Sequence, residues 1–246
     1  MNVFCLHGFT GSPASWDAVR DTVRDKVLGH SLFCPELLGH GASRSTSASF
    51  EDEVDALADL VRQSGPPVLA AGYSQGGRLA LGLLIRHPDL CQAGLLIGAS
   101  PGLRTEAERA ARREADERLA QRLENDGLEV FLETWRSLPL FASQQRLPAA
   151  RLRRQEAIRS AHQPTELARA LRILGLGAMP NYWDALTKVE HPVRLMVGGE
   201  DTKFLALAEQ MASLLPCPTV EIVDGAGHNL LLEAPERVAA AISRNR

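Results

Sequence analysis

The sequence of 246 residues lacks the long apolar runs of membrane proteins. No run approaches the roughly 18–20 residues that a membrane-spanning helix needs. The first eight residues carry no basic region, and their apolar run is too short for a secretory signal peptide. These absences lead us to expect no membrane partner and a cytoplasmic location.

Cysteine is also scarce, and positive charge is not in excess. Cys5, Cys34, Cys91 and Cys217 lie far apart and form no CxxC pair, so we expect four reduced thiols and no bound metal. The formal net charge of -3 argues against a nucleic-acid partner. Internal repeats and low-complexity tracts are missing, and a hydrophobic content of 45% is enough for one sizeable core. The oligomeric state leaves no mark on the sequence.

Short apolar runs alternate with longer helical patterns along the chain. Apolar residues at helical spacing predict helices over 50–63, 76–86, 205–215 and 235–243. The short runs predict strands at 3–6, 31–34, 68–71, 95–97, 193–197 and 220–223, of which the first and the last three are expected to be buried. This alternation predicts an α/β fold with a mostly parallel sheet covered by helices on both faces.

Residues 103–174 break this alternation. They contain no convincing strand and hold 14 Arg, no Lys and 11 acids, whereas the rest of the chain is net acidic. We therefore divide the chain into a core of residues 1–102 and 175–246 and an all-helical cap of residues 103–174. Many of these arginines can be solvated surface partners of nearby Glu residues. Their excess over Lys also suggests bidentate recognition of carboxylates by some of them.

A sharp turn for a nucleophile is predicted at Gly72-Tyr73-Ser74-Gln75-Gly76. This G-x-S-x-G pattern follows a buried strand and opens a helix, the context of a nucleophile elbow. The backbone N–H of Gln75 is the expected first oxyanion donor. The backbone N–H of Phe9, in the loop after the first strand, is the expected second donor.

An acid and a base follow Ser74 in the order that this turn requires. Asp201 comes after the strand at 193–197, and His228 comes after the strand at 220–223. Both lie where the carboxyl ends of parallel strands place ligands. Glu200 and Asp224 are rival acids, and Asp201 is preferred because it is the last loop acid before the next helix. The sequence therefore predicts a catalytic triad of Ser74, Asp201 and His228, and the remaining histidines are interpreted as structural or solvated.

Within the α/β-hydrolase fold, the chain resembles the 2-succinyl-6-hydroxy-2,4-cyclohexadiene-1-carboxylate synthase family, the lyases of menaquinone biosynthesis. The more particular matching features are Arg78 directly after Gly77, Pro101-Gly102-Leu103, Ala178-Met179-Pro180 with Trp183, and Asp201-Thr202-Lys203-Phe204. Two features depart from the family. The leading strand pair is expected to be absent or very short, and Gln75 stands where the family more often has Leu or Met.

The resemblance implies a lyase that eliminates pyruvate from 2-succinyl-5-enolpyruvyl-6-hydroxy-3-cyclohexene-1-carboxylate without a cofactor. This small-molecule substrate carries three carboxylates, for which the resemblance implies Arg78, Arg112 and Arg159 as ligands. It also implies that Tyr73, Trp135 and Phe141 line the pocket, although plain packing would suit these aromatics equally well. The alternatives are a serine carboxylesterase or thioesterase acting through an acyl-enzyme, and a binding protein without catalysis. An intact triad argues against the binding protein.

Overall fold

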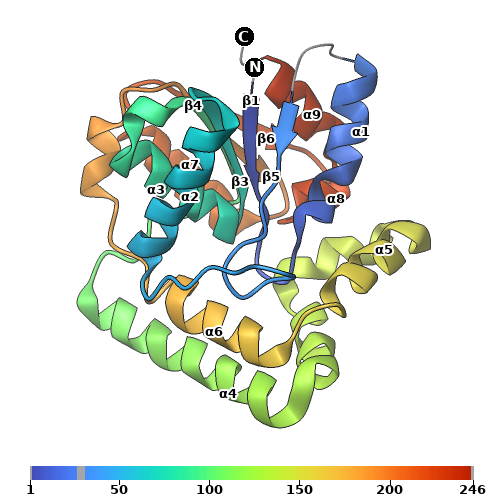
Figure 1. The fold of residues 1–246 in the computed structure, drawn as a ribbon. Coiled ribbons are helices and arrows are strands. Elements are labelled where there is room, and N and C mark those ends of the chain that lie inside the picture. The colour runs from blue at the N-terminus through green and yellow to red at the C-terminus, as the bar shows by residue number, and fades with distance from the viewer. Residues whose placement is uncertain (1, 27–30, 245–246) are drawn as a thin grey trace.

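A computed structural model describes residues 2–26 and 31–244 of the chain. Six strands in these residues form one sheet in the order β2-β1-β3-β4-β5-β6, and every neighbouring pair is parallel. The predicted α/β-hydrolase fold is therefore confirmed, with its parallel sheet at the centre (Figure 1). The strands are β1 (Asn2–Leu6), β2 (Ser31–Phe33), β3 (Val68–Tyr73), β4 (Cys91–Ile97), β5 (Val193–Gly198) and β6 (Pro218–Val223).

Alternate residues of the central strands face two different cores. Phe4 and Leu6 of β1 pack with the helices on one face, whereas Val3 and Cys5 pack with the helices on the other. This period of two is what a strand buried on both faces requires. The first core contains α2 (Phe50–Ser64), α3 (Gln75–Arg86) and α7 (Thr202–Ala212), and the second contains α1 (Asp17–Lys26), α8 (Leu230–Glu233) and α9 (Pro235–Ser243).

The cap region forms helices that lie across the carboxyl ends of the strands (Figure 1). Helix α4 begins after Thr105, whose side chain and that of Glu108 form a reciprocal capping box. Gly127, with φ of 84°, interrupts α4. Buried apolar residues of α4 and α6, among them Leu123 and Leu171, form a third core. The cap elements are α4 (Glu106–Arg136), the 3-10 helix η3 (Pro139–Arg146), α5 (Ala149–Arg159) and α6 (Pro164–Leu174).

One expectation about burial is wrong. The strand at 220–223 was expected to be buried, but Val220 and Ile222 of β6 are 36% and 43% exposed. The reason is topological, because β6 lies at the edge of the sheet and has a neighbour on one side only. The apolar run resembles that of a central strand and does not reveal this position.

Some element boundaries also differ from those expected. Helix α7 begins at Thr202, directly after Asp201, and not at position 205. Helix α1 and the short 3-10 helix η1 (Pro13–Trp16) before it were not anticipated at all. Two further 3-10 helices, η2 (Pro88–Leu90) and η4 (Asp184–Lys188), lie in connections. Among the described residues, no helix is long and apolar enough to cross a membrane.

Candidate active site

Ser74 occupies a strained turn between β3 and α3. Its φ of 51° and ψ of -108° are rare for a residue with a side chain, and α3 begins at the next residue. Backbone segments approach each other closely around this turn, and two of the neighbouring positions therefore require glycine. A Cβ on Gly72 would lie 2.2 Å from the Gly76 carbonyl oxygen, and one on Gly76 would lie 2.2 Å from that of Leu6. The turn therefore presents Ser74 at the carboxyl-end edge of the sheet.

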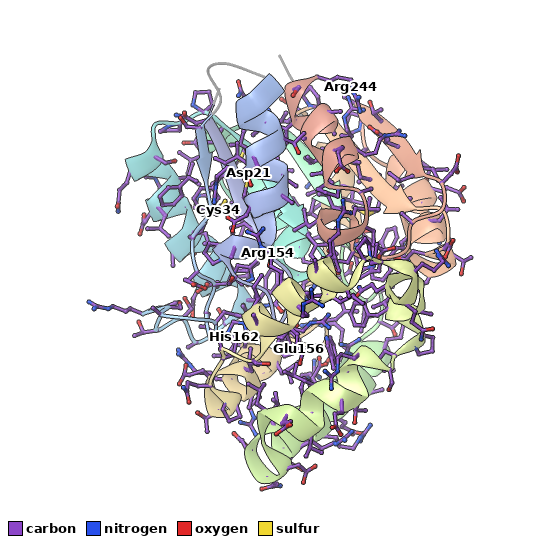
Figure 2. All side chains as sticks on the ribbon, turned by 90° about the vertical axis from the view of Figure 1, so that its right-hand side faces the viewer. Asp21, Cys34, Arg154, Glu156, His162 and Arg244 are labelled. Carbon is purple, nitrogen blue, oxygen red and sulfur yellow. The ribbon has the colours of Figure 1, made fainter. Side chains whose placement is uncertain are left out.

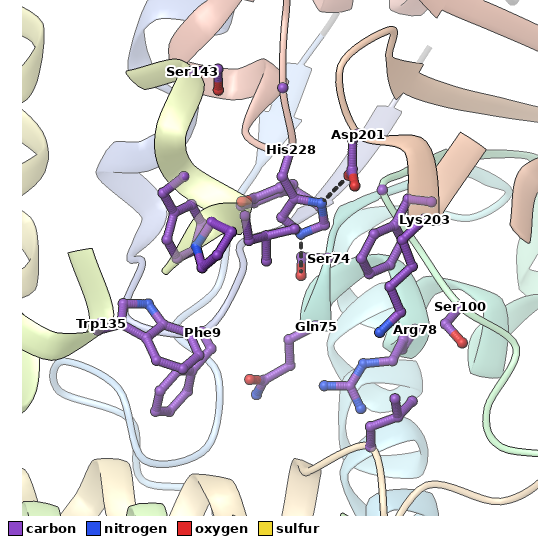
Figure 3. A pocket seen from close by; sticks show the side chains of 18 of the residues that line it. Phe9, Ser74, Gln75, Arg78, Ser100, Trp135, Ser143, Asp201, Lys203 and His228 are labelled. Carbon is purple, nitrogen blue, oxygen red and sulfur yellow. Dashed lines mark hydrogen bonds and ion pairs between the residues drawn. The ribbon is translucent and has the colours of Figure 1, made fainter. Parts of the chain in front are cut away.

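Ser74, His228 and Asp201 form one chain of hydrogen-bonding groups (Figure 3). The distance from His228 Nε2 to Ser74 Oγ is 3.0 Å, and that from His228 Nδ1 to Asp201 Oδ2 is 2.6 Å. His228 and Asp201 are buried, and the 2.6 Å contact fixes the orientation of the imidazole ring. In this arrangement Nε2 can accept the Ser74 proton while the Asp201 carboxylate stabilises the imidazolium.

The two rival acids take other positions. Glu200 accepts hydrogen bonds from the Arg146 guanidinium at 2.7 Å, on the rim of the site. Asp224 is exposed. Asp201 reaches His228 because it lies at the end of β5, in the loop whose backbone bonds to that of residues 223–226. The geometry therefore selects Asp201 as the partner of His228.

The backbone N–H groups of Phe9 and Gln75 lie on the two loops expected to form the oxyanion hole. Neither group has a hydrogen-bond acceptor among residues 2–26 and 31–244. Three histidines hold the loop that carries Phe9. The ring of His40 accepts the N–H of Thr10 at 3.1 Å, the ring of His162 contacts the Thr10 carbonyl at 3.2 Å, and His7 accepts the N–H of Leu37 at 3.3 Å.

Burial disfavours the charged form of these three histidines. Desolvation lowers the pKa of His7 to about 4 and lowers that of His40 well below its usual value. It also lowers the pKa of His162, and the three rings contact one another edge to face through His40. A histidine ring can accept a backbone N–H only when it is neutral. These three histidines therefore have the structural role, holding loops, that the sequence analysis expects of them.

A cavity of about 610 Å³ opens in front of Ser74. It lies between the core and the cap, and its walls come from both (Figure 3). All but one of the residues predicted for the site line this cavity: Phe9, Tyr73, Ser74, Gln75, Arg78, Arg112, Trp135, Phe141, Asp201 and His228. The exception is Arg159.

One wall of the cavity is cationic. Arg78 donates to the Leu174 carbonyl at 2.8 Å, and Arg112 pairs with the buried Asp116 at 2.8 Å. Burial and the neighbouring Arg112 lower the pKa of Arg78 to about 10, so it stays charged at neutral pH. Lys203 adds a third cation from the first turn of α7 (Figure 3). One carboxylate, that of Asp116, therefore faces two guanidinium groups and leaves positive charge for a ligand.

Sequence reasoning did not assign a binding role to Lys203. In the sequence, Lys203 is noted only as part of the Asp201-Thr202-Lys203-Phe204 motif. Its position two residues after the predicted catalytic acid is the feature that indicates a place near the site. The side chain extends into the cavity because α7 begins at Thr202, directly after Asp201, which places the first residues of the helix at the cavity wall.

Three neutral polar groups in the cavity wall have no partner among the described residues. They are the Gln75 side-chain amide Nε2, the Trp135 indole Nε1 and the Ser143 hydroxyl. Buried polar groups are normally hydrogen-bonded, and an unpaired one costs about 1–3 kcal/mol. All three atoms are buried within the wall and are unpaired in the described part of the structure. Gln75 thus places a polar amide in the cavity wall, where the family more often has Leu or Met.

Arg159 lies behind the aromatic wall. The residue is 5% exposed, with its guanidinium 5.3 Å from the Phe141 ring centroid, and it lines a neighbouring cavity of about 240 Å³. Tyr73 and Phe141 line both cavities and separate them. Desolvation lowers the pKa of Arg159, although the nearby Tyr73 opposes this shift. The structure therefore does not bring Arg159 into direct contact with the space before Ser74.

In the part of the chain that the structure describes, no group of three His, Cys, Asp or Glu side chains is arranged to hold a metal ion. The site thus offers a nucleophile, a base, two free backbone N–H groups and a cationic wall. This combination can move a proton, stabilise a developing oxyanion and hold an anionic ligand.

Comparison with known proteins identifies relatives along nearly the whole chain. A family model described as the Alpha/beta hydrolase family matches residues 3–241. A thermophilic esterase from Thermogutta terrifontis, solved with malate bound, covers 99% of this chain and 88% of its own at 24% identity and a TM-score of 0.79. At that identity the likeness shows a shared fold.

Two relatives of higher identity share one name, and a third comparison is with a solved structure. A Bacillus subtilis (strain 168) protein, provisionally named 2-succinyl-6-hydroxy-2,4-cyclohexadiene-1-carboxylate synthase, is 36% identical over 98% of this chain and 88% of its own. A Salmonella agona (strain SL483) protein with this name is 33% identical over 97% and 91%. The solved structure of MenH from S. aureus is 28% identical, with a TM-score of 0.92 over 99% of this chain and 92% of that chain. The chain belongs to the alpha/beta hydrolase family of enzymes and, within it, to the 2-succinyl-6-hydroxy-2,4-cyclohexadiene-1-carboxylate synthase family.

Proposed function

We propose that this protein eliminates pyruvate from 2-succinyl-5-enolpyruvyl-6-hydroxy-3-cyclohexene-1-carboxylate to give 2-succinyl-6-hydroxy-2,4-cyclohexadiene-1-carboxylate, a step of menaquinone biosynthesis. One observation carries the proposal: a Ser74–His228–Asp201 chain and a cationic wall share one cavity. The first moves a proton, and the second suits a substrate with several carboxylates. The names of the relatives support the same reaction.

Substrate binding is assigned to the cationic wall. The guanidinium groups of Arg78 and Arg112 would each hold a carboxylate, with Lys203 as a third cation at the same wall. Arg159 would act across the Phe141 ring as a more distant positive charge. Tyr73, Trp135 and Phe141 would enclose the cyclohexene ring. A tricarboxylate is the small-molecule partner that this charge pattern fits, and the proposal involves no metal or organic cofactor.

Proton abstraction is assigned to the Ser74–His228–Asp201 triad. His228 Nε2 takes the Ser74 hydroxyl proton, and the resulting alkoxide takes the activated proton of the substrate. The electron pair of the broken C–H bond enters the ring and becomes part of the conjugated diene. The C–O bond to the enolpyruvyl group breaks, and the departing enolate accepts the proton held by His228 and forms pyruvate. Protons and electrons balance, and Ser74 ends the cycle carrying the proton taken from the substrate.

The oxyanion hole stabilises the charge that develops during abstraction. As the proton leaves, negative charge moves toward the succinyl carbonyl oxygen. The backbone N–H groups of Phe9 and Gln75 are assigned as its donors. Loss of one such donor typically costs about 10²–10³ in kcat. The site therefore lowers the barrier without forming an acyl-enzyme.

The esterase or thioesterase alternative uses the same triad in a different way. Ser74 would attack a carbonyl carbon and form an acyl intermediate. A neutral ester gains nothing from three cations at one wall, so this alternative leaves the charge pattern unexplained.

A direct comparison of two substrates tests the proposal. Purified protein is assayed for pyruvate release from the enolpyruvyl substrate, with coupled lactate dehydrogenase, and for hydrolysis of a neutral aryl ester. We expect pyruvate release to be the main activity and to disappear in Ser74→Ala. Ester hydrolysis without pyruvate release would overturn the proposal. The cytoplasmic location is part of the same proposal, and cell fractionation with a specific antibody would test it.

A further inference from the structure

Two cysteines that the proposed reaction does not use lie side by side on the opposite side of the sheet from α3. Strands β1 and β2 pair in parallel, and their last paired residues are Phe4 and Phe33. Cys5 directly follows Phe4, and Cys34 directly follows Phe33. Both pack against the core that contains Trp16 and α1. Neighbouring parallel strands lie about 4.8 Å apart, within the Cα separation of about 4.4–6.8 Å that a disulfide needs.

A basic side chain contacts one of the two sulfur atoms. Arg20 of α1 donates from Nη2 to Cys34 Sγ at 3.3 Å, and Asp17 holds the same guanidinium at 2.5 Å. Cys34 is half-buried, and Figure 2 shows it beside α1. Cys5 is fully buried behind it. Small oxidants can thus reach Cys34 first.

The electrostatics distinguish the two thiols. A hydrogen bond from Cys5 and the charge of Arg20 lower the pKa of Cys34, although burial opposes the shift. Burial and the neighbouring Cys34 raise the pKa of Cys5. A cysteine whose sulfur contacts a guanidinium and whose pKa is lowered, with a second thiol beside it, has the arrangement of a reactive cysteine and its resolving partner.

We propose that Cys34 is a site of oxidation by hydroperoxides and that Cys5 resolves it as an intramolecular disulfide. The Cys34 thiolate attacks the peroxide oxygen, the O–O bond breaks, and Cys34 sulfenic acid forms with release of hydroxide. The Cys5 sulfur then attacks the Cys34 sulfur and displaces the hydroxyl group, which leaves as water with the Cys5 proton. In total, two thiols and hydrogen peroxide give one disulfide and two waters.

This inference is independent of the proposed lyase reaction and extends the expectation of four reduced thiols. No disulfide joins the four cysteines in the structure. Cys91 is buried and Cys217 is exposed. Cys217 provides a matched control because it is more accessible to solvent than Cys34 but lacks the Arg20 contact.

The experiment follows thiols and masses after treatment with hydrogen peroxide. Reduced, folded protein is exposed to the oxidant, denatured, alkylated with iodoacetamide and mapped by mass spectrometry. We expect wild type and Cys217→Ser each to lose two thiols and to yield a peptide pair linked through Cys5 and Cys34. Cys34→Ser should form no such link. Cys5→Ala should accumulate a dimedone adduct at Cys34, because the sulfenic acid lacks its partner.

A further variant tests the role of the guanidinium. Arg20→Gln should slow formation of the disulfide by about threefold or more, since the thiolate loses its cation. Circular dichroism and thermal unfolding establish that each variant is folded. Retention of all four thiols in folded wild type would overturn the proposal. So would oxidation at Cys217 faster than at Cys34, or a link between Cys5 and Cys34 that forms only after denaturation.

Discussion

Replacing Arg78 with Ala should weaken catalysis with little loss of stability. Arg78 has one protein hydrogen bond, to the Leu174 carbonyl, while the remainder of its fork lies in the cavity wall beside Arg112. Removing it also removes the cost of burying a guanidinium and its repulsion from Arg112, the two causes that lower its pKa, and this partly offsets the lost hydrogen bond. A hydrogen bond to a charged group is worth about 1.5–3 kcal/mol, which corresponds to roughly 10- to 200-fold in kcat/KM.

The neighbouring Arg112 should be more sensitive than Arg78. Arg112→Ala removes a cation and also leaves Asp116, which is 2% exposed, without its 2.8 Å partner. The cavity wall thereby gains an uncompensated carboxylate that repels the substrate. Arg159→Ala should have the smallest effect of the three, because the Tyr73–Phe141 wall lies between it and the space before Ser74. The structure thus predicts that the loss of kcat/KM is largest for Arg112→Ala, smaller for Arg78→Ala and smallest for Arg159→Ala. The number of positive charges removed, one in each variant, predicts no such order.

The assay measures kcat/KM for pyruvate release in the three Ala variants, with thermal unfolding as a check on folding. Arg118→Ala is the matched control, because Arg118 is an exposed residue of the same helix as Arg112 and does not line the cavity. Arg78→Lys should recover only part of the loss, since a point charge does not replace a planar fork. Values within threefold of wild type for both Arg78→Ala and Arg112→Ala would refute the carboxylate-binding assignment.

Three further predictions concern the triad, the elbow and acid stability. Ser74→Ala and His228→Ala should each lower pyruvate release by several powers of ten, and Asp201→Asn somewhat less, because the three act as a unit; near wild-type turnover in Ser74→Ala would contradict the mechanism. Gly76→Ala should prevent the elbow from forming, since its Cβ would lie 2.2 Å from the Leu6 carbonyl oxygen; an unchanged melting temperature and turnover would refute this. His7 has a folded pKa of about 4, whereas the unfolded chain binds that proton below about 6.5. Its contribution to stability should therefore fall as the pH drops from 6.5 to 4, by about 3 kcal/mol in total. Urea unfolding of wild type and His7→Asn across this range measures the effect, and equal pH dependence in both would exclude it.

Local patterns in the sequence were enough to predict much of the architecture. The alternation of apolar runs and helical patterns led to the parallel sheet, and the strand, glycines and Ser74 in sequence led to the elbow. These features depend on neighbours along the chain, where steric limits on the backbone and the period of burial act directly. The absence of strands from 103–174 predicted the cap helices for the same reason.

Other properties depend on residues that only folding brings together. Whether Asp201 or Glu200 orients His228 was decided by how the β5 loop meets the residues before His228, and the exposure of β6 was decided by its place at the sheet edge. The position of Arg159 behind Phe141, and the entry of Lys203 into the cavity, follow from how cap and core pack. The proximity of Cys5 to Cys34 follows from the register of β1 and β2, across 29 positions of sequence. The sequence alone does not show that these residues lie close together. The distances between remote segments, and the burial of their side chains, are determined by tertiary packing.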